Sequence, residues 1–137
     1  MWKEKYRIGV NLIDDQHQEL FKRLSGFIQI VQNNISWEDK LEEIKSTLDF
    51  LEEYVIFHFN DEENYMREIN YPDYESHKQI HENFTNEIND YIVLFETAGF
   101  TEDKMKELNA RLMTWLIMHI GRMDQEIGKY AKEKGGY

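Results

Sequence analysis

Apolar residues recur in steps of three and four along four long stretches of the chain. The second stretch shows the pattern most clearly, through Leu41, Ile44, Leu48, Leu51, Val55, His58, Glu62 and Tyr65. This spacing is that of the buried face of an amphipathic helix. A histidine and a glutamate therefore occupy a helix face that is otherwise built for a hydrophobic core.

Start and stop signals place the predicted helices at residues 15–33, 37–66, 72–97 and 101–131. Asp15 followed by Gln18, and Ser36 followed by Asp39, fit N-terminal caps. Pro72 suits a first helical turn, because its missing N–H costs nothing there. Four amphipathic helices with short connections predict an all-α fold, an antiparallel up-down-up-down four-helix bundle. We expect one domain over residues 1–137, with residues 1–14 forming an N-terminal arm.

Composition narrows the class of protein. The formal net charge is -11 and no run of Lys or Arg is present, which disfavours nucleic acid as a partner. Such an acidic surface favours a monomer. The absence of cysteine rules out disulfides and thiolate ligands and suits a reducing cytoplasm. Neither a signal peptide nor an apolar run of about 18 residues is found, so we expect a cytoplasmic protein without membrane contact.

All five histidines fall on the apolar faces, namely His17, His58, His77, His81 and His119. A single buried histidine is commonly a core imidazole bonded to a backbone carbonyl, but five together favour metal ligands. Residues four apart share one helix face, so His58 converges with Glu62. His77 converges with His81 for the same reason. No Lys or Arg shares the face of Glu62, and a bound metal would answer the charge of that buried carboxylate.

Asp124 follows His119 by five residues, a spacing that would point the two side chains apart on a straight α-helix. The apolar pattern also resumes one residue late after His119. Both features indicate a π-type turn or a break near residues 120–123, easiest at Gly121. The alternative is that Asp124 is a surface carboxylate on a fraying helix end.

The candidate ligands are thus five histidines and two carboxylates. Seven side chains exceed the four of a tetrahedral zinc site, whereas two octahedral ions that share both carboxylates would use all of them. Imidazole and carboxylate donors without sulfur suit iron, manganese or zinc, and the donor types alone do not choose among these metals.

The chain resembles the hemerythrin family, in particular the single-domain bacteriohemerythrins. The resemblance covers nearly the whole chain through the motifs WKEKYRIGVNLID, DDQHQELF, YVIFHFNDEENYM, HKQIH and WLIMHIGRMD. It implies a non-haem di-iron centre with an oxo or hydroxo bridge. The implied ligands of one iron are His77, His81 and His119, those of the other are His17 and His58, and both irons share Glu62 and Asp124.

The resemblance further implies that the second iron has only five ligands, so that dioxygen binds there end-on as hydroperoxide and leaves again. The expected function is a reversible oxygen carrier, store or delivery protein rather than an enzyme. Phe59, Trp115 and Leu116 are expected to line the oxygen pocket, although ordinary core packing explains them equally well. Asp61 and Glu63 are expected to be solvated, so that Glu63→Ala would leave the bound metal unchanged.

Other functions could use the same residues. A di-iron enzyme, such as a peroxidase or a protein that handles nitric oxide, would use the same open position. An oxygen sensor would require a separate partner protein, because the segment KEKGGY leaves no room for a fused signalling domain. A metal-free bundle would leave the buried histidines and carboxylates without compensation.

Overall fold

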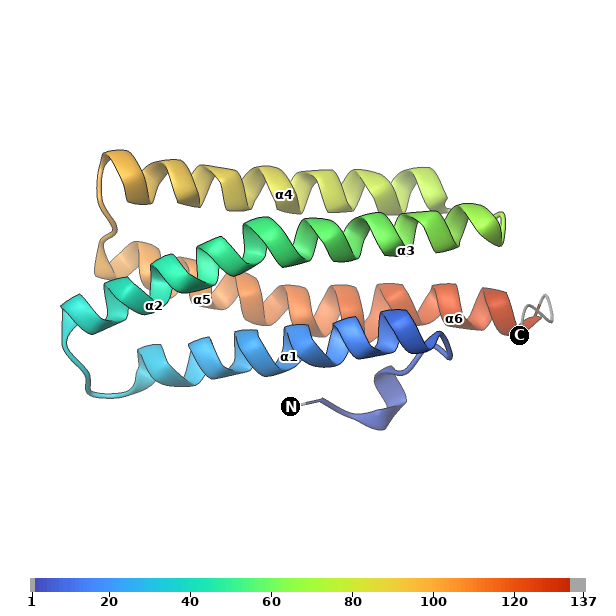
Figure 1. Cartoon of the computed structure of the whole chain (residues 1–137), viewed down its shortest axis with the longest axis horizontal. Helices are drawn as coiled ribbons and strands as arrows, with labels where there is room; N and C mark the ends of the chain where they lie inside the picture. The colour runs from blue at the N-terminus through green and yellow to red at the C-terminus, as the bar shows by residue number, and fades with distance from the viewer. Residues whose placement is uncertain (1, 134–137) are drawn as a thin grey trace.

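The computed structural model describes residues 2–133, which form helices and loops without any strand. The helices are arranged as rods that lie side by side and alternate in direction (Figure 1). The first rod is α1 (Asn11–Gln32). The second joins α2 (Trp37–Phe50), the π-helical segment η2 (Leu51–Val55) and α3 (Ile56–Glu68) end to end.

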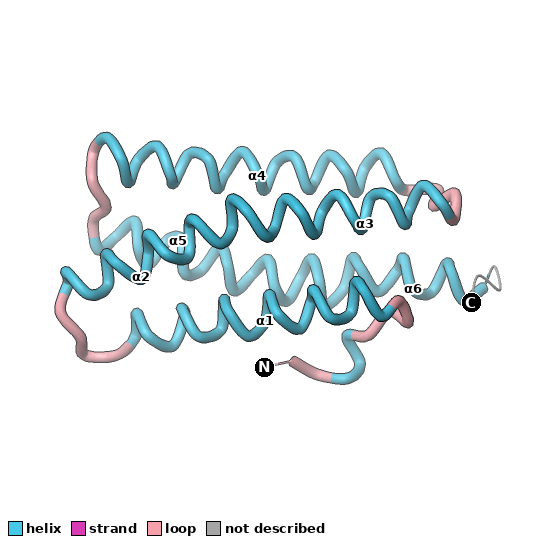
Figure 2. Tube along the Cα trace, in the orientation of Figure 1, coloured by secondary structure: helices cyan, strands magenta, loops and turns pink. Residues whose placement is uncertain are grey.

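The third rod is α4 (Tyr74–Thr97), and the fourth joins α5 (Glu102–Trp115), the π-helical segment η3 (Leu116–Met123) and α6 (Asp124–Glu133). Short loops connect the rods (Figure 2). The predicted all-α four-helix bundle is therefore confirmed. The domain predicted over residues 1–137 also includes residue 1 and residues 134–137, which lie outside the described part of the chain.

Side-chain caps begin two of the helices. Ser36 Oγ accepts a hydrogen bond from the backbone N–H of Asp39, and Thr101 Oγ1 accepts one from the N–H of Lys104. Each cap satisfies a donor that the first helical turn leaves unpaired. Gly99, the second residue after α4, adopts a positive φ of 78°, which is the left-handed conformation that glycine adopts at little cost.

The start of α1 differs from the prediction. The helix begins at Asn11 rather than at Asp15, and the neighbouring Asp14 is the aspartate that holds this end. The Asp14 carboxylate is buried and accepts hydrogen bonds from the backbone N–H groups of Ile8 (2.7 Å) and Gly9 (3.2 Å). Asp14 thereby ties the N-terminal arm to the bundle, whereas Asp15 is exposed.

The arm, residues 2–10, contains the short 3₁₀ helix η1 (Glu4–Tyr6) and folds back beneath α1 (Figure 1). The ring of Tyr6 stacks on Phe21 with 5.2 Å between centroids, and Trp2 packs edge-to-face against the ring of Phe21. Gln125 Nε2 donates a hydrogen bond to the carbonyl of Tyr6 at 2.6 Å. The arm is thus fixed to the first and the last rods.

Gly128 on α6 provides a test of how tightly the arm packs. A Cβ atom at this position would lie 2.9 Å from both Cβ and the carbonyl oxygen of Ile8, closer than real Cβ contacts allow. We expect Gly128→Ala to lower the free energy of unfolding by about 1–3 kcal/mol, the usual cost of overpacking. Urea denaturation would measure this. Gly26→Ala on α1 is the control, because no neighbouring atom of residues 2–133 lies within 4 Å of its added Cβ. An equal loss in both variants would contradict the close packing at Gly128.

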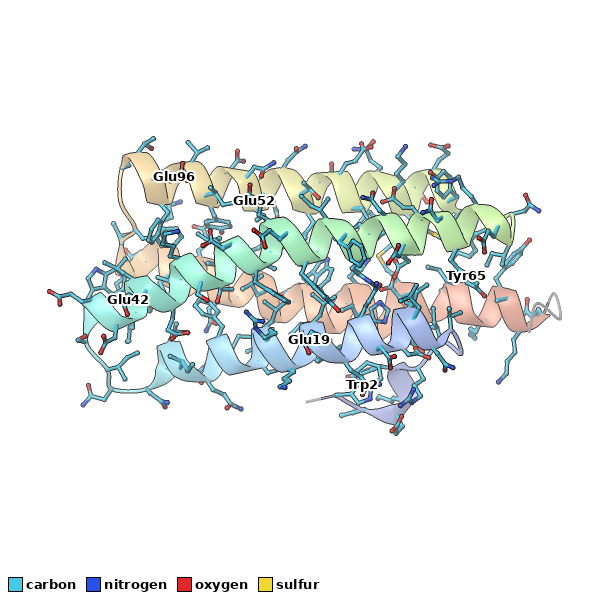
Figure 3. All side chains as sticks on the ribbon, in the orientation of Figure 1. Trp2, Glu19, Glu42, Glu52, Tyr65 and Glu96 are labelled. Carbon is cyan, nitrogen blue, oxygen red and sulfur yellow. The ribbon has the colours of Figure 1, made fainter. Side chains whose placement is uncertain are left out.

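The core consists of two apolar clusters along the bundle. The larger cluster contains Leu24, Leu48, Ile88 and Leu112 and extends to Phe59 and Trp115. The smaller cluster lies near the arm and contains Ile8, Ile13, Met66, Tyr71 and Ile127. The side chains that fill the space between the ribbons are drawn in Figure 3, where Glu42, Glu52 and Glu96 are labelled examples of the exposed acidic residues. None of the helices within residues 2–133 has the length and apolarity needed to cross a bilayer.

Candidate metal centre

All seven predicted ligands lie in the bundle interior, and none is more than 3% exposed. Every rod contributes at least one of them: His17 from α1, His58 and Glu62 from α3, His77 and His81 from α4, His119 from η3 and Asp124 from α6. The structure therefore brings together residues that are up to 107 positions apart in the chain, from 17 to 124. Their role as metal ligands remains a prediction.

Glu62 lies between two groups of imidazoles. Its Oε1 atom is 2.9 Å from His77 Nε2 and 3.2 Å from His81 Nε2. Its Oε2 atom faces the other way, 3.2 Å from His17 Nε2 and 3.4 Å from His58 Nε2. One carboxylate thus offers one oxygen to each group, as a carboxylate that bridges two ions would.

Asp124 repeats this arrangement. Its Oδ1 atom lies 3.0 Å from His77 Nε2 and 3.4 Å from His119 Nε2, and its Oδ2 atom lies 3.1 Å from His17 Nε2. The donor atoms form two sets, each within 4.8 Å: Glu62, His77, His81, His119 and Asp124 in one, and His17, His58, Glu62 and Asp124 in the other. The two carboxylates are common to both sets.

The π-helical segment η3 places His119 and Asp124 on the same side of their rod. A π-helix closes its hydrogen bonds between residues five apart, so the five-residue spacing of these two side chains becomes one turn. The segment begins at Leu116, earlier than the break expected near residues 120–123. Gln125 Nε2 also donates to the Ile120 carbonyl at 3.3 Å, within this irregular stretch.

The orientation of the donor atoms fits metal ions. His58 Nε2 and both Asp124 carboxylate oxygens are buried and have no hydrogen-bond partner within residues 2–133, although imidazole nitrogens lie close by. His81 Nε2 and His119 Nε2 are 3.1 Å apart, which places two ring nitrogens that could both be lone-pair donors side by side. Buried polar atoms are normally paired, and ions between the two carboxylates would satisfy them all.

Without a bound ion, protons would have to compensate the carboxylates. Burial lowers the pKa of His17, but its contacts with Asp124 and Glu62 outweigh burial and raise the pKa to about 9. The same balance raises the pKa of His77 to about 10. For His119 burial prevails and lowers the pKa to about 4. Burial would raise the pKa of Glu62, yet the surrounding imidazoles hold it well below its usual value.

These pKa values predict that metal uptake at pH 7 releases at least two protons per chain, one each from His17 and His77, because metal ligands must be deprotonated; contacts with Glu62 and Glu63 raise the pKa of His81 as well. Calorimetric titration with Zn²⁺ in two buffers of different ionisation enthalpy would measure the release. The variant His17→Gln should release about one proton fewer. Metal uptake without any proton release would contradict the protonated state of these two imidazoles.

Glu63 and Asp61 were expected to be solvated, and that expectation was wrong: Glu63 contacts a histidine of the centre directly, and Asp61 is linked to one through Gln16. Glu63 Oε2 accepts a hydrogen bond from His81 Nδ1 at 2.7 Å, and the Glu63 side chain is only 12% exposed. Asp61 accepts a hydrogen bond from Gln16 Nε2 at 2.7 Å, and Gln16 Oε1 in turn accepts one from His58 Nδ1 at 2.7 Å. Gln16 was not predicted, and only its position next to His17 could have suggested it.

Aromatic rings pack against the histidines on the side of the larger apolar cluster. Phe59 stacks on His81 with 3.8 Å between centroids, and Trp115 stacks on His119 at 5.3 Å. Leu116 is completely buried nearby in the same cluster. These residues are therefore placed to keep water from the donor atoms, while their role in lining an oxygen pocket remains a prediction.

Comparison with known proteins agrees with this geometry. Residues 8–131 match the family model of the hemerythrin HHE cation binding domain. A bacteriohemerythrin from Clostridium acetobutylicum is 28% identical over 92% of this chain and 96% of its own length. One from Stenotrophomonas maltophilia is 30% identical over 96% of this chain and 81% of its own length, and one from Campylobacter jejuni is 32% identical over 90% and 89%.

Proposed function

The chain belongs to the hemerythrin family of cation-binding domains, and on this premise we propose that it binds dioxygen reversibly at a pair of non-haem iron ions. In this proposal, His77, His81 and His119 hold one ion, His17 and His58 hold the other, and Glu62 and Asp124 bridge them. The protein would serve as an oxygen carrier, store or delivery protein rather than as an enzyme.

The observation that carries the proposal is the unequal division of the histidines. Three imidazoles face one side of the carboxylate pair and two face the other side. Among the described residues, the two-histidine side therefore has one protein donor fewer, so an ion there would have one more coordination position open to a small ligand. Iron ions held there would supply the electrons that reversible dioxygen binding requires.

The surrounding residues support reversible binding because they exclude water. All seven donor side chains are buried, and the rings of Phe59 and Trp115 stack on His81 and His119 of the three-histidine group. Trp115 is itself held by a stack on Phe84, with 4.7 Å between centroids. A dry site would keep water and protons away from bound dioxygen, whose loss as hydrogen peroxide would leave oxidised iron behind and end reversible binding.

Absorption spectroscopy of the iron-loaded protein tests this function. The anaerobically reduced protein is exposed to dioxygen and then purged with inert gas, and the spectrum of the reduced protein should return over repeated cycles. Irreversible bleaching after one cycle would overturn the proposal. Turnover with peroxide and a reductant, or with nitric oxide, would instead support a di-iron enzyme, and an oxygen-dependent complex with another protein would support a sensor.

His17 is the informative variant for the two-histidine side, because its Nε2 atom lies near both Glu62 and Asp124. We expect His17→Ala to oxidise irreversibly at least ~10-fold faster than the parent protein under air, a typical penalty for loosening a metal site. Stopped-flow absorption would measure this rate. Gln18→Ala, which changes the next residue on α1, is the control. An unchanged rate in His17→Ala would show that His17 does not hold the oxygen-reactive ion.

A further inference from the structure

The imidazoles of the centre differ in what lies behind them, on the side away from the carboxylate pair. His81 Nδ1 donates a hydrogen bond to the carboxylate of Glu63, at 2.7 Å. His58 Nδ1 donates one to the neutral amide oxygen of Gln16, also at 2.7 Å. For His17 and His119, the Nδ1 atom is buried and has no hydrogen-bond partner among residues 2–133.

A single face of α3 holds the His81 ring from three directions. Phe59 stacks flat on the ring, with 3.8 Å between centroids and 7° between planes. Glu62 Oε1 lies 3.2 Å from Nε2, and Glu63 Oε2 lies 2.7 Å from Nδ1. The three residues are spaced three and four apart from Phe59, so they share one side of the helix. His81 is therefore fixed between two carboxylates that are neighbours in sequence.

The corresponding position behind His58 carries no direct charge. Gln16 is 4% exposed, and its amide nitrogen donates to Asp61 at 2.7 Å, so the nearest carboxylate is one hydrogen bond further away. On the side away from Glu62 and Asp124, a ligand ring of the three-histidine group thus bonds a carboxylate, whereas a ligand ring of the two-histidine group bonds an amide. This difference does not follow from the shared ligands Glu62 and Asp124, which offer one oxygen to each group.

We propose that Glu63 is a positioning residue that places negative charge behind only one of the two metal positions, through the Nδ1–H of His81. This inference rests on the proposed function insofar as it requires metal ions at the centre. A carboxylate that accepts the second N–H of a ligating histidine orients the ring and makes it a stronger donor. The three-histidine position is therefore the more electron-rich one, and the charge of Glu63 favours the oxidised state of the iron pair.

The variants separate charge from hydrogen bonding. Glu63→Gln keeps an acceptor for His81 and removes the charge, whereas Glu63→Ala removes both. Glu68→Gln, an exposed residue on the same helix, controls for the general loss of one negative charge. The reciprocal change is Gln16→Glu combined with Asp61→Asn, which puts a carboxylate behind His58 and avoids a like-charge contact.

Two measurements follow, one of them independent of iron chemistry. Competition titration with Zn²⁺ should show that Glu63→Ala binds one of two ions about 10–100-fold more weakly, with Glu63→Gln recovering part of the loss. Potentiometric titration of the iron-loaded proteins should show that each change of charge behind a ligand histidine alters the redox equilibrium of the iron pair tenfold relative to the parent protein. This corresponds to a shift in potential of about 59 mV for a one-electron step. The shift should be positive for Glu63→Gln, negative for the Gln16→Glu, Asp61→Asn double variant and absent for Glu68→Gln.

The outcomes distinguish this inference from the proposed function. If Glu63→Gln and Glu68→Gln share the potential of the parent protein, the role of Glu63 is overturned, even where dioxygen binding is reversible. If the parent protein holds two ions but does not bind dioxygen reversibly, the proposed function fails, while a charge-dependent potential still supports the role of Glu63. Should Glu63→Ala fail to fold, Glu63→Gln alone decides, because it preserves side-chain shape.

Discussion

Glu62→Ala is expected to strip the protein of most of its bound metal. The two oxygens of Glu62 lie within 3.4 Å of the Nε2 atoms of four histidines, two on each side. Its removal would therefore weaken both metal positions at once and leave the imidazoles without their shared counter-charge. We expect a loss of affinity above ~100-fold, because changing a residue outside the donor set typically costs about 10–100-fold and Glu62 is itself a predicted donor. Elemental analysis after gel filtration against a chelator would measure retained metal per chain.

Two neighbouring carboxylates on α3 calibrate this result. Glu68→Ala, at an exposed position, should leave metal content unchanged. Glu63→Ala should fall between the two, because Glu63 contacts only His81 and does so from outside the donor set. A ranking in which Glu63→Ala loses more metal than Glu62→Ala would mean that the bridging position has been assigned to the wrong carboxylate.

The fold and the gathering of the seven side chains could be predicted because both depend on helical periodicity. Buried positions recur every three or four residues, so polar residues at His58 and Glu62 had to face the same interior as the leucines around them. Asp124 could be predicted because it interrupts this period. The one-residue shift of the apolar pattern after His119 corresponds to the π-helical segment η3. A regular pattern and its single irregularity together located the centre.

Features that depend on tertiary contacts left no comparable trace. The π-helical segment η2 lies within an apolar series that continues by threes and fours through Leu51 and Val55, so nothing marked it. Asp14 and Asp15 are adjacent and chemically alike, and only the position of the arm decides that Asp14 binds the backbone of Ile8 and Gly9. Glu63 was misjudged for a related reason: its spacing places it at the edge of a buried face, and only the neighbouring α4 gives it a partner.

Removal of the metal is expected to lower the midpoint of thermal unfolding by more than about 10 °C. An ion present at ~1,000 times its dissociation constant stabilises the folded state by about 4 kcal/mol, and each kcal/mol shifts the midpoint of a domain of this size by about 3 °C or more. His58 Nε2, which is buried without a hydrogen-bond partner among residues 2–133, adds to the loss. Calorimetry before and after chelation would measure the shift, and reloading with Zn²⁺ should restore it.

The pH dependence of the chelated protein gives this experiment its sharpest outcome. His17 and His77 have pKa values of about 9 and about 10 in the fold, above the ordinary 6.5, so their stabilising contribution is complete below pH 6.5 and is lost as the pH rises to 10. His119, with its pKa lowered to about 4, has already lost its proton in both states above pH 7 and adds no slope there. The metal-loaded protein should show the opposite trend, because protons compete with metal ions for the same nitrogens. Between pH 7 and 10 the chelated protein should therefore become less stable while the loaded protein does not. Parallel pH profiles for the two forms would mean that the imidazoles neither hold protons against Glu62 and Asp124 nor give them up to a metal.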